Sequence, residues 1–269
     1  MKHGVWVLRT PATPDMQEML EFAVAAEESG WDGVFVSDSI AFQSTDPWVT
    51  LSAIAARTER VTLGTWITAP AQQPPWRLAQ ALASLDRLSG GRVLLGTGLG
   101  VGDDFSKFGD DLSPAARARK YDESLDLMAR FWTGQPVTFD GEFYQVKDVT
   151  LPILPLQQPR IPVVVGGWWP NKKPFHRAAA WDGLMPYWPA LLGGQVGPEG
   201  QTSTGTSEGE LRDLMAYYRD VAQGAGEIVI PREQPDDPAF DALAEELGAT
   251  WLLSAYGLDF DEVRQGPPW

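Results

Sequence analysis

Cysteine is absent from the 269-residue sequence, and histidine occurs only as His3 and His176. Without cysteine the chain can form no disulfide framework, thiol nucleophile or cysteine-based metal site. Two histidines also exclude a histidine-rich metal site. We therefore expect no resident metal, and the lack of cysteine fits a reducing, cytoplasmic location.

Positive charge is scarce as well. Lys and Arg together number 21 against 36 Asp and Glu, which gives a formal net charge of −15. Such a chain is repelled by phosphate backbones and by anionic lipid, so we expect no nucleic-acid partner. Apolar runs of the roughly 20 residues needed to span a bilayer are missing, and the first residues enter a strand pattern without a signal-peptide core. We expect a soluble, intracellular protein with no membrane partner.

Short apolar runs alternating with helical periodicity fill most of the chain, and 43% hydrophobic residues can form a large core. Length alone allows one barrel-sized domain or two smaller ones. The predicted strands cover residues 5–8, 33–37, 61–65, 93–95, 162–165, 183–186, 227–230 and 251–255. The predicted helices begin near residues 14, 47, 75, 114, 175, 211 and 239. Only fourteen residues follow the last strand, so an eighth helix has at most a turn or two.

Eight buried strands separated by helices, without a polar alternation, favour an α/β fold: a (β/α)₈ TIM barrel formed as a single domain by residues 1–269. An open doubly wound sheet is the alternative. Residues 137–146 break the rhythm and predict an inserted β-hairpin around Asp140-Gly141. Residues 187–210 are rich in Gly, Ser, Thr and Gln, and we expect a mobile lid over 192–207.

The most informative stretch is residues 91–104, where the strand Val93–Leu95 leads into alternating glycines. This pattern has two interpretations: a tight strand-to-helix turn, or backbone amides lying against a flat ring or a phosphate. It is not the dinucleotide-binding fingerprint, because Val101 takes the place of the third glycine and Pro114 begins the next helix too late.

The active site of a TIM barrel lies at the carboxyl ends of its strands. The residues there are aromatic, rich in glycine and poor in charge: 37–39, 65–68, 96–104, 166–169, 185–187 and 254–256. This rim suits a large planar cofactor better than a sugar phosphate, for which we would expect Lys or Arg at the strand ends.

At these residues the chain resembles the bacterial luciferase-like monooxygenase family, whose members bind FMN or the deazaflavin coenzyme F420. The matching stretches are AEESGWDGVFVSD, DPWVTLSAIAARTERVTLGTWIT, ASLDRLSGGRVLLGTGLG, YDESLDLMARFWTG, VTFDGEFY, PRIPVVVGG and AAAWDGLMP. They cover most of residues 1–190 in order, and the remainder matches weakly. The resemblance implies the family's barrel and hydride transfer or oxygenation of a small-molecule substrate by a reduced flavin-type ring.

The resemblance also implies site residues. Asp38 would lie beside the ring and, with Ser39, take part in catalysis. Trp66-Ile67 would form the third-strand bulge, where family members often carry a non-proline cis peptide under one ring face. The implied cofactor-binding residues are Asp38, Thr65, Trp66, Ile67, Thr68, Gly96, Thr97, Gly98, Gly100, Gly102, Gly166, Gly167, Trp168 and Trp169. Gly96 to Gly102 would line the phosphate or ribityl arm, and Gly166 and Gly167 with the amides of Trp168 and Trp169 would complete that cradle. The alternatives are a capping or loop role for Asp38 and plain barrel packing for Trp66.

The sequence departs from the family at two places. Many members have His directly after the second-strand acid, where this chain has Ser39, and a hydroxyl alone is a poor general base. Lys172 and Lys173 follow the fifth strand, where they could favour an anionic cofactor tail such as that of F420 or could simply be solvated at a helix start. We expect His176 to cap or pack on that helix.

Two functional classes therefore stay open: an F420- or FMN-dependent oxidoreductase, and a family member that only binds a flavin or another planar ligand. The sequence identifies neither the substrate nor the choice between oxygenase and reductase. We also expect a homodimer, because family barrels usually pair through helices and 12 Trp are more than one core readily hides.

Overall fold

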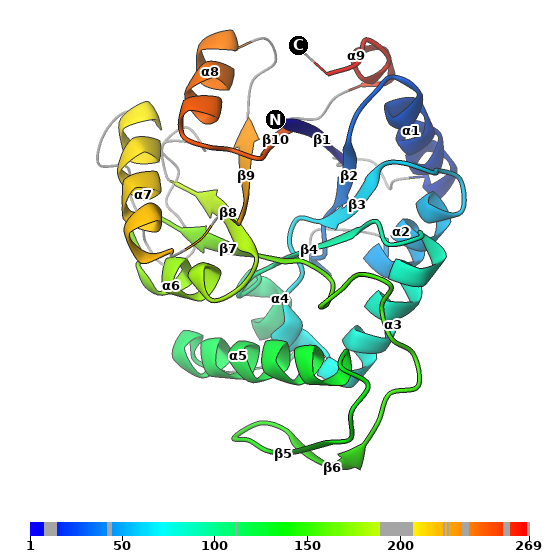
Figure 1. The fold of residues 1–269 in the computed structure, drawn as a ribbon, viewed down its shortest axis with the longest axis vertical. Helices are drawn as coiled ribbons and strands as arrows, with labels where there is room; N and C mark the ends of the chain where they lie inside the picture. Colours follow the sequence, from blue (N-terminus) through cyan, green and yellow to red (C-terminus); the bar gives the residue numbers. More distant parts are fainter. Residues whose placement is uncertain are drawn as a thin grey trace.

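Eight parallel strands close into a barrel in the order β1-β10-β9-β8-β7-β4-β3-β2, with helices around it (Figure 1). The barrel strands are β1 (Lys2–Val7), β2 (Gly33–Val36), β3 (Thr62–Thr65), β4 (Val93–Thr97), β7 (Val163–Trp168), β8 (Gly183–Tyr187), β9 (Glu227–Arg232) and β10 (Trp251–Ser254). The computed structural model describes residues 1–7, 15–41, 45–110, 112–188, 207–222, 224, 226–232, 237–254 and 259–267. The predicted barrel is confirmed.

The helices that cover the barrel follow the strands in turn. They are α1 (Met16–Glu28), α2 (Pro47–Ala55), α3 (Pro75–Leu88), α5 (Pro114–Phe131), α6 (Lys173–Ala179), α7 (Ser207–Val221), α8 (Pro238–Glu246) and α9 (Phe260–Arg264). Several begin with a side-chain cap followed by proline, as at Asp46-Pro47 and Ser113-Pro114, where the cap oxygen accepts from amides of the first turn. No helix in the described ranges is both long and apolar enough to cross a membrane.

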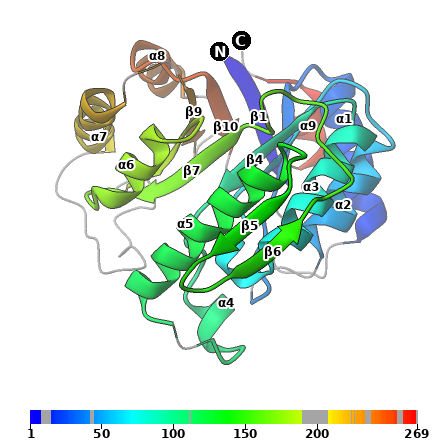
Figure 2. The ribbon, with the colours of Figure 1, turned by 60° about the horizontal axis from the view of Figure 1, so that its bottom comes forward.

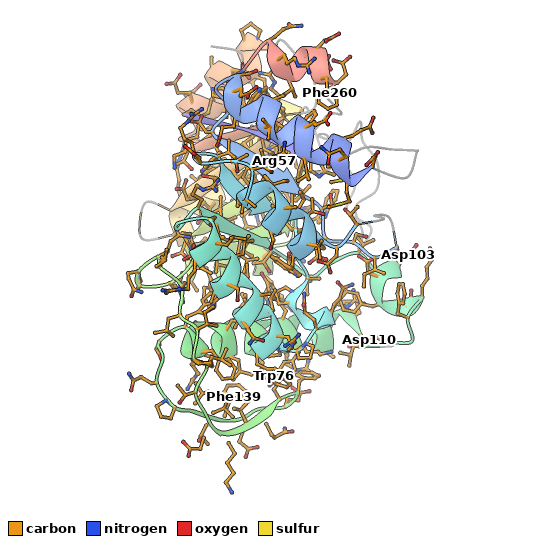
Figure 3. All side chains as sticks on the ribbon, turned by 90° about the vertical axis from the view of Figure 1, so that its right-hand side faces the viewer. Arg57, Trp76, Asp103, Asp110, Phe139 and Phe260 are labelled. Atoms are coloured by element: carbon orange, nitrogen blue, oxygen red, sulfur yellow. The ribbon has the colours of Figure 1, made fainter. Side chains whose placement is uncertain are left out.

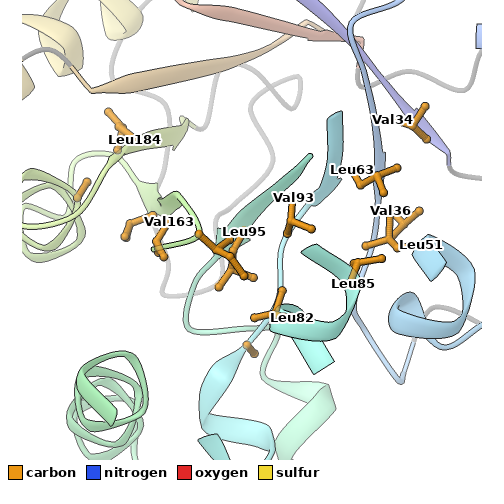
Figure 4. Packing of buried hydrophobic residues seen from close by; sticks show 14 of the residues in the cluster. Val34, Val36, Leu51, Leu63, Leu82, Leu85, Val93, Leu95, Val163 and Leu184 are labelled. Atoms are coloured by element: carbon orange, nitrogen blue, oxygen red, sulfur yellow. The ribbon is translucent and has the colours of Figure 1, made fainter. Parts of the chain in front are cut away.

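Two apolar layers hold the barrel together because alternate residues of each strand face its axis or its helices. On the helix side, Leu51 of α2 and Leu85 of α3 lie beside Val36 and Leu63 (Figure 4). The interior cluster contains Phe35, Trp66, Leu94, Val164, Met185, Val229, Trp251 and Leu253. Phe35 fills the axis because its neighbour Gly64 has no side chain: a Cβ there would lie 2.3 Å from the Phe35 ring.

The inserted hairpin consists of β5 (Val137–Asp140) and β6 (Gln145–Val149), which lie against α5 outside the barrel (Figure 2). The hairpin is confirmed, but its second strand begins at Gln145 rather than at residue 143. The Glu123 carboxylate on α5 accepts hydrogen bonds from the amides of Glu142 (2.7 Å) and Phe143 (3.0 Å). These bonds hold the backbone in a longer turn than an Asp-Gly pair would make.

Other boundaries differ from the prediction. Strand β7 continues through Gly166 and Gly167 to Trp168, since both glycines pair with β8, whereas the sequence predicts that they end the strand. Two short helices are unpredicted: η1 (Pro70–Gln72) and α4 (Asp103–Ser106). The short eighth helix is confirmed as α9, which Asp259 and Glu262 stabilise through a capping box. The predicted lid over 192–207 lies outside the described residues except for Ser207.

Candidate functional site

The chain leaves β3 through a non-proline cis peptide between Trp66 and Ile67, as the resemblance implies. The Trp66 amide donates to the Val36 carbonyl of β2 (2.8 Å), and the Thr68 amide donates to the Gly96 carbonyl of β4 (2.9 Å). The bulge is therefore tied to the strands on both sides and stands at the carboxyl ends of the barrel strands.

The glycines of β4 and β7 make room for this bulge. A Cβ at Gly98 would lie 2.5 Å from the Ile67 Cδ1 atom, and one at Gly166 would lie 2.7 Å from the same atom. A Cβ at Gly96 would lie 2.0 Å from the Thr65 carbonyl oxygen. Three of the predicted cofactor-binding glycines thus have a packing role that needs no ligand. Their contact with a cofactor stays a prediction.

The second half of the glycine stretch turns into α4. Gly100 has a φ of 74°, which a glycine adopts readily, and Gly102 immediately precedes the helix. The first turn of α4 carries Asp103 and Asp104, and Figure 3 shows Asp103 at the outer edge of the molecule. Negative charge at this point opposes a phosphate. That these glycines contact the ribityl arm of a cofactor stays a prediction. Helix α4 gives no support for a phosphate at this place.

The expected cradle at the end of β7 is only partly available. Gly166 and Gly167 belong to the β7–β8 ladder, and the Trp169 amide donates to the Tyr187 carbonyl oxygen (2.8 Å). The Trp169 amide is thus already bound by β8, and the contact of Trp168 and Trp169 with a cofactor stays a prediction. The Trp168 ring stacks on the Tyr187 ring, with centroids 5.5 Å apart and an angle of 22°.

Asp38 follows β2 and has the most unusual environment of the predicted site residues. Its Oδ2 atom is buried and has no hydrogen-bond partner. Burial raises the pKa of the Asp38 carboxyl to about 6, and the nearby carboxylates of Asp46 and Asp104 add to the increase. The buried Thr68 hydroxyl lowers this pKa, although it lies outside hydrogen-bond geometry. Asp38 is therefore a carboxyl that can exchange a proton near neutral pH, and it does not cap a helix.

Ser39 is not an isolated hydroxyl. Its Oγ donates to Asp104 Oδ1 (3.0 Å), and the Ala41 amide donates to the same oxygen (2.6 Å). Asp104 is 4% exposed, and its own carbonyl oxygen accepts from the Gln72 side chain (3.2 Å). The loop after β2 is thus fastened to α4. The sequence gives no signal for this pair, because 65 residues separate its members.

Two of the predicted cofactor-binding threonines face away from the barrel axis. Thr65 Oγ1 donates to the Gly96 carbonyl oxygen (2.7 Å). The Thr97 hydroxyl lowers the pKa of Tyr121 of α5, although these two hydroxyls are not within hydrogen-bond geometry. Side chains two residues apart on a strand face the same side, and Leu95 belongs to the core between the strands and the helices. Thr97 therefore faces the helices as well. Burial raises the pKa of Tyr121, so its hydroxyl stays protonated. Both threonines therefore contribute to packing, and their contact with a cofactor stays a prediction.

Lys172 lies between two aromatic rings. Its Nζ is 3.4 Å from the Trp169 ring centroid and 3.9 Å from that of Tyr217 on α7. Partial burial lowers the pKa of this amine, although the side chain as a whole is exposed. His176 of α6 packs as expected, with its Nε2 atom 2.8 Å from the Tyr217 hydroxyl. Lys172 is exposed directly before α6, which agrees with the solvated interpretation, and its amine also contacts two rings.

The sequence also missed Trp6. Its ring lies 4.6 Å from the Trp66 ring, and its Nε1 donates to Ser37 Oγ (2.8 Å). Alternate residues of a strand face the same side, and Gly4 faces the Phe35 ring inside the barrel. Trp6, two residues further along β1, therefore also faces the inside of the barrel.

The carboxyl ends of β2 and β3 carry three buried polar atoms that form no hydrogen bond: Asp38 Oδ2, Trp66 Nε1 and Thr68 Oγ1, of which Thr68 lies near enough to Asp38 to lower its pKa. Buried polar atoms in proteins nearly always have a partner, so such a group indicates a place for a polar ligand. A planar ring with polar edges, such as a flavin or deazaflavin, fits this site, because the aromatic rings can contact its face and the polar atoms can bond to its edge. Within the described ranges, no group of three or more His, Asp or Glu is placed to hold a metal ion.

Known proteins share sequence and fold with this chain. The sequence pattern described as luciferase-like monooxygenase matches residues 1–190. The chain is 36% identical over 159 residues to a protein named F420-dependent glucose-6-phosphate dehydrogenase from Microbacterium testaceum. That match covers 55% of this chain and 46% of the relative, so the chain spans about half the length of the curated relatives it matches.

Solved structures share the fold. The monooxygenase RslO1 from Streptomyces bottropensis has a TM-score of 0.78 and 21% identity, over 98% of this chain and 96% of that one. The F420-dependent tetrahydromethanopterin reductase from Methanopyrus kandleri has a TM-score of 0.71 and 14% identity, with the same coverage of 98% and 96%. At these identities the likeness establishes the barrel alone.

Proposed function

We propose that this chain, which belongs to the luciferase-like monooxygenase family, is an oxidoreductase that uses coenzyme F420 or FMN on a small organic substrate. The observation that carries the proposal is the set of buried polar atoms that form no hydrogen bond at Asp38, Trp66 and Thr68 beside the cis peptide. F420 is the favoured cofactor, because the 36% identical relative is named for it. When bound, such a ring supplies the acceptance or donation of a hydride.

In this proposal Asp38 exchanges a proton at the edge of the ring or the substrate. A carboxyl with a pKa of about 6 is ionised in roughly nine molecules of ten at pH 7, and it regains a proton at little cost. Thr68 and Trp66 offer a hydroxyl and an indole N–H to the polar edges of the cofactor. Ser39 donates to Asp104, so it orients the loop after β2 and does not replace the missing histidine as a base.

The proposal extends to the whole chain. We infer one barrel domain over residues 1–269 and a cytoplasmic location. We also infer a homodimer formed through the exposed apolar side chains of α2 and α3, where Val49 is 62% exposed, Leu88 55% and Trp76 36%. Helices α2 and α3 pack against each other, so together they can bury these side chains against a second copy of the chain.

The test uses protein purified from a host that makes both cofactors. The absorption band of a deazaflavin lies at shorter wavelength than that of a flavin, so a spectrum identifies the bound ring. Asp38→Asn should weaken cofactor binding or slow hydride transfer by about tenfold or more, roughly 1.4 kcal/mol. Asp126→Asn, which removes a surface carboxylate paired with Arg130 on α5, is the matched control and should change neither.

A protein that binds neither ring contradicts the proposal. The protein could instead bind one ring tightly while the reduced ring is not oxidised by carbonyl compounds, quinones or oxygen. That result supports the second candidate. That candidate is a family member that only binds the planar ligand, and the substitution of Ser39 for the usual histidine favours it.

A further inference from the structure

Four aromatic rings form a continuous row across the carboxyl ends of the barrel strands. Trp6 of β1 lies 4.6 Å from Trp66, Trp66 lies 5.7 Å from Tyr187 of β8, and Tyr187 lies 5.5 Å from Trp168 of β7. The last two pairs are stacked, with angles of 30° and 22° between their planes. We name these four residues the aromatic row.

The aromatic row rests on the interior core. Trp66 belongs to that core and is 8% exposed, and Trp6 and Tyr187 pack against it while keeping part of their surface accessible. Trp168, at the end of the row, is also only partly buried. Burial raises the pKa of Tyr187, so its hydroxyl is a neutral donor. The row therefore offers flat π-faces and uncharged hydrogen-bond donors.

Two cations near the strand ends contact other side chains of the protein, whereas Lys173 at the start of α6 is exposed. Lys172, four residues after Trp168, lies over the rings of Trp169 and Tyr217. Arg232 at the end of β9 is 2% exposed, and its Nη1 atom donates to both carboxylate oxygens of Asp241 (2.8 Å each). Neither can turn to a ligand without losing these contacts.

Helix α4 carries Asp103 and Asp104, and two cations lie beside it: Lys107 Nζ is 2.8 Å from Asp103, and the Arg117 guanidinium is 3.8 Å from the Phe105 ring centroid. The sequence adds little positive charge beyond the described residues. Arg9 is the sole Lys or Arg in the segments 8–14, 42–44, 189–206, 233–236 and 255–258. A phosphate group is normally held by several Arg, Lys or helix-start amides, and after β7 the structure provides the two exposed lysines Lys172 and Lys173 at the start of the seven-residue helix α6.

We infer that the substrate is a fused-ring aromatic compound with a keto or hydroxyl group, stacked on the Trp168–Tyr187 end of the aromatic row. This inference rests on the proposed function for the position of the reacting ring. It separates this chain from its curated relatives, whose names specify glucose 6-phosphate, a substrate with a dianionic group and no flat apolar face.

The experiment titrates full-length protein calorimetrically with 1-hydroxyanthraquinone and, separately, with glucose 6-phosphate, in the presence and absence of saturating F420. We expect the anthraquinone to bind whether or not F420 is present, and glucose 6-phosphate not to saturate the protein at millimolar concentration. Trp168→Leu should weaken anthraquinone binding at least about tenfold, whereas Trp168→Phe should keep most of it. Trp181→Leu is the matched control, because Trp181 follows α6 outside the row and packs on Arg160.

Three results would overturn the inference: tighter binding of glucose 6-phosphate than of the anthraquinone, equal anthraquinone binding by wild type and Trp168→Leu, or displacement of the anthraquinone by F420. The last would show that the row stacks on the cofactor itself. Cofactor binding is measured on every variant. If F420 and FMN both fail to bind, the proposed function fails. If a cofactor binds and the anthraquinone does not, the inference alone fails.

Discussion

Replacing Asp38 by Asn should make the ligand-free protein more stable at neutral pH. Burial raises the pKa of the Asp38 carboxyl from 3.8 to about 6, so the folded state favours the protonated form. The ionised carboxylate therefore costs folding free energy, and this cost appears as the pH rises from about 4 to 6. A shift of about two pKa units corresponds to roughly 3 kcal/mol above pH 7 and to about half of that near pH 5. Asparagine has no charge and avoids this cost.

Urea unfolding followed by circular dichroism near pH 5 and near pH 8 measures the effect. The stabilisation by Asp38→Asn should be larger at the higher pH, by about 1 kcal/mol or more. Asp104→Asn is the matched control of opposite sign, because Asp104 accepts from Ser39 and Ala41 and its loss should destabilise by about 1–3 kcal/mol. A less stable Asp38→Asn protein, or a difference that does not change with pH, would refute the argument that Asp38 is ionised at a cost.

Two further predictions concern packing and assembly. Gly96→Ala should destabilise by about 1–3 kcal/mol in the same urea assay, because its Cβ would lie 2.0 Å from a backbone oxygen. Gly102→Ala, whose Cβ would meet no atom within 4 Å, should stay within about 0.5 kcal/mol of wild type. Light scattering should give twice the 29.5 kDa chain mass at micromolar concentration, and Val49→Lys with Leu88→Lys should reduce it to one chain. A wild-type mass of 29.5 kDa would defeat the dimer.

Local sequence signals determined the barrel. Apolar runs such as residues 93–95, each followed by a helix with its own start signal, specify strand and helix from neighbours within a few positions. The same signals located the hairpin at 137–146, the short eighth helix and the rim of residues at the strand ends. The cis peptide at Trp66-Ile67 came from the family resemblance and not from any local pattern.

Tertiary structure decided what the rim residues do. The proximity of Asp46 and Asp104 to Asp38, the Ser39–Asp104 bond and the contact between Trp6 and Trp66 all join residues from different strands or loops. Such contacts depend on barrel closure and register, which shorter-range periodicity does not encode. Strand parity likewise turned Thr97 toward the helices, and the β8 carbonyl took up the amide of Trp169. The pKa of a carboxyl group and the neighbours of an aromatic ring depend on the residues packed around them, and those residues come together only when the barrel closes.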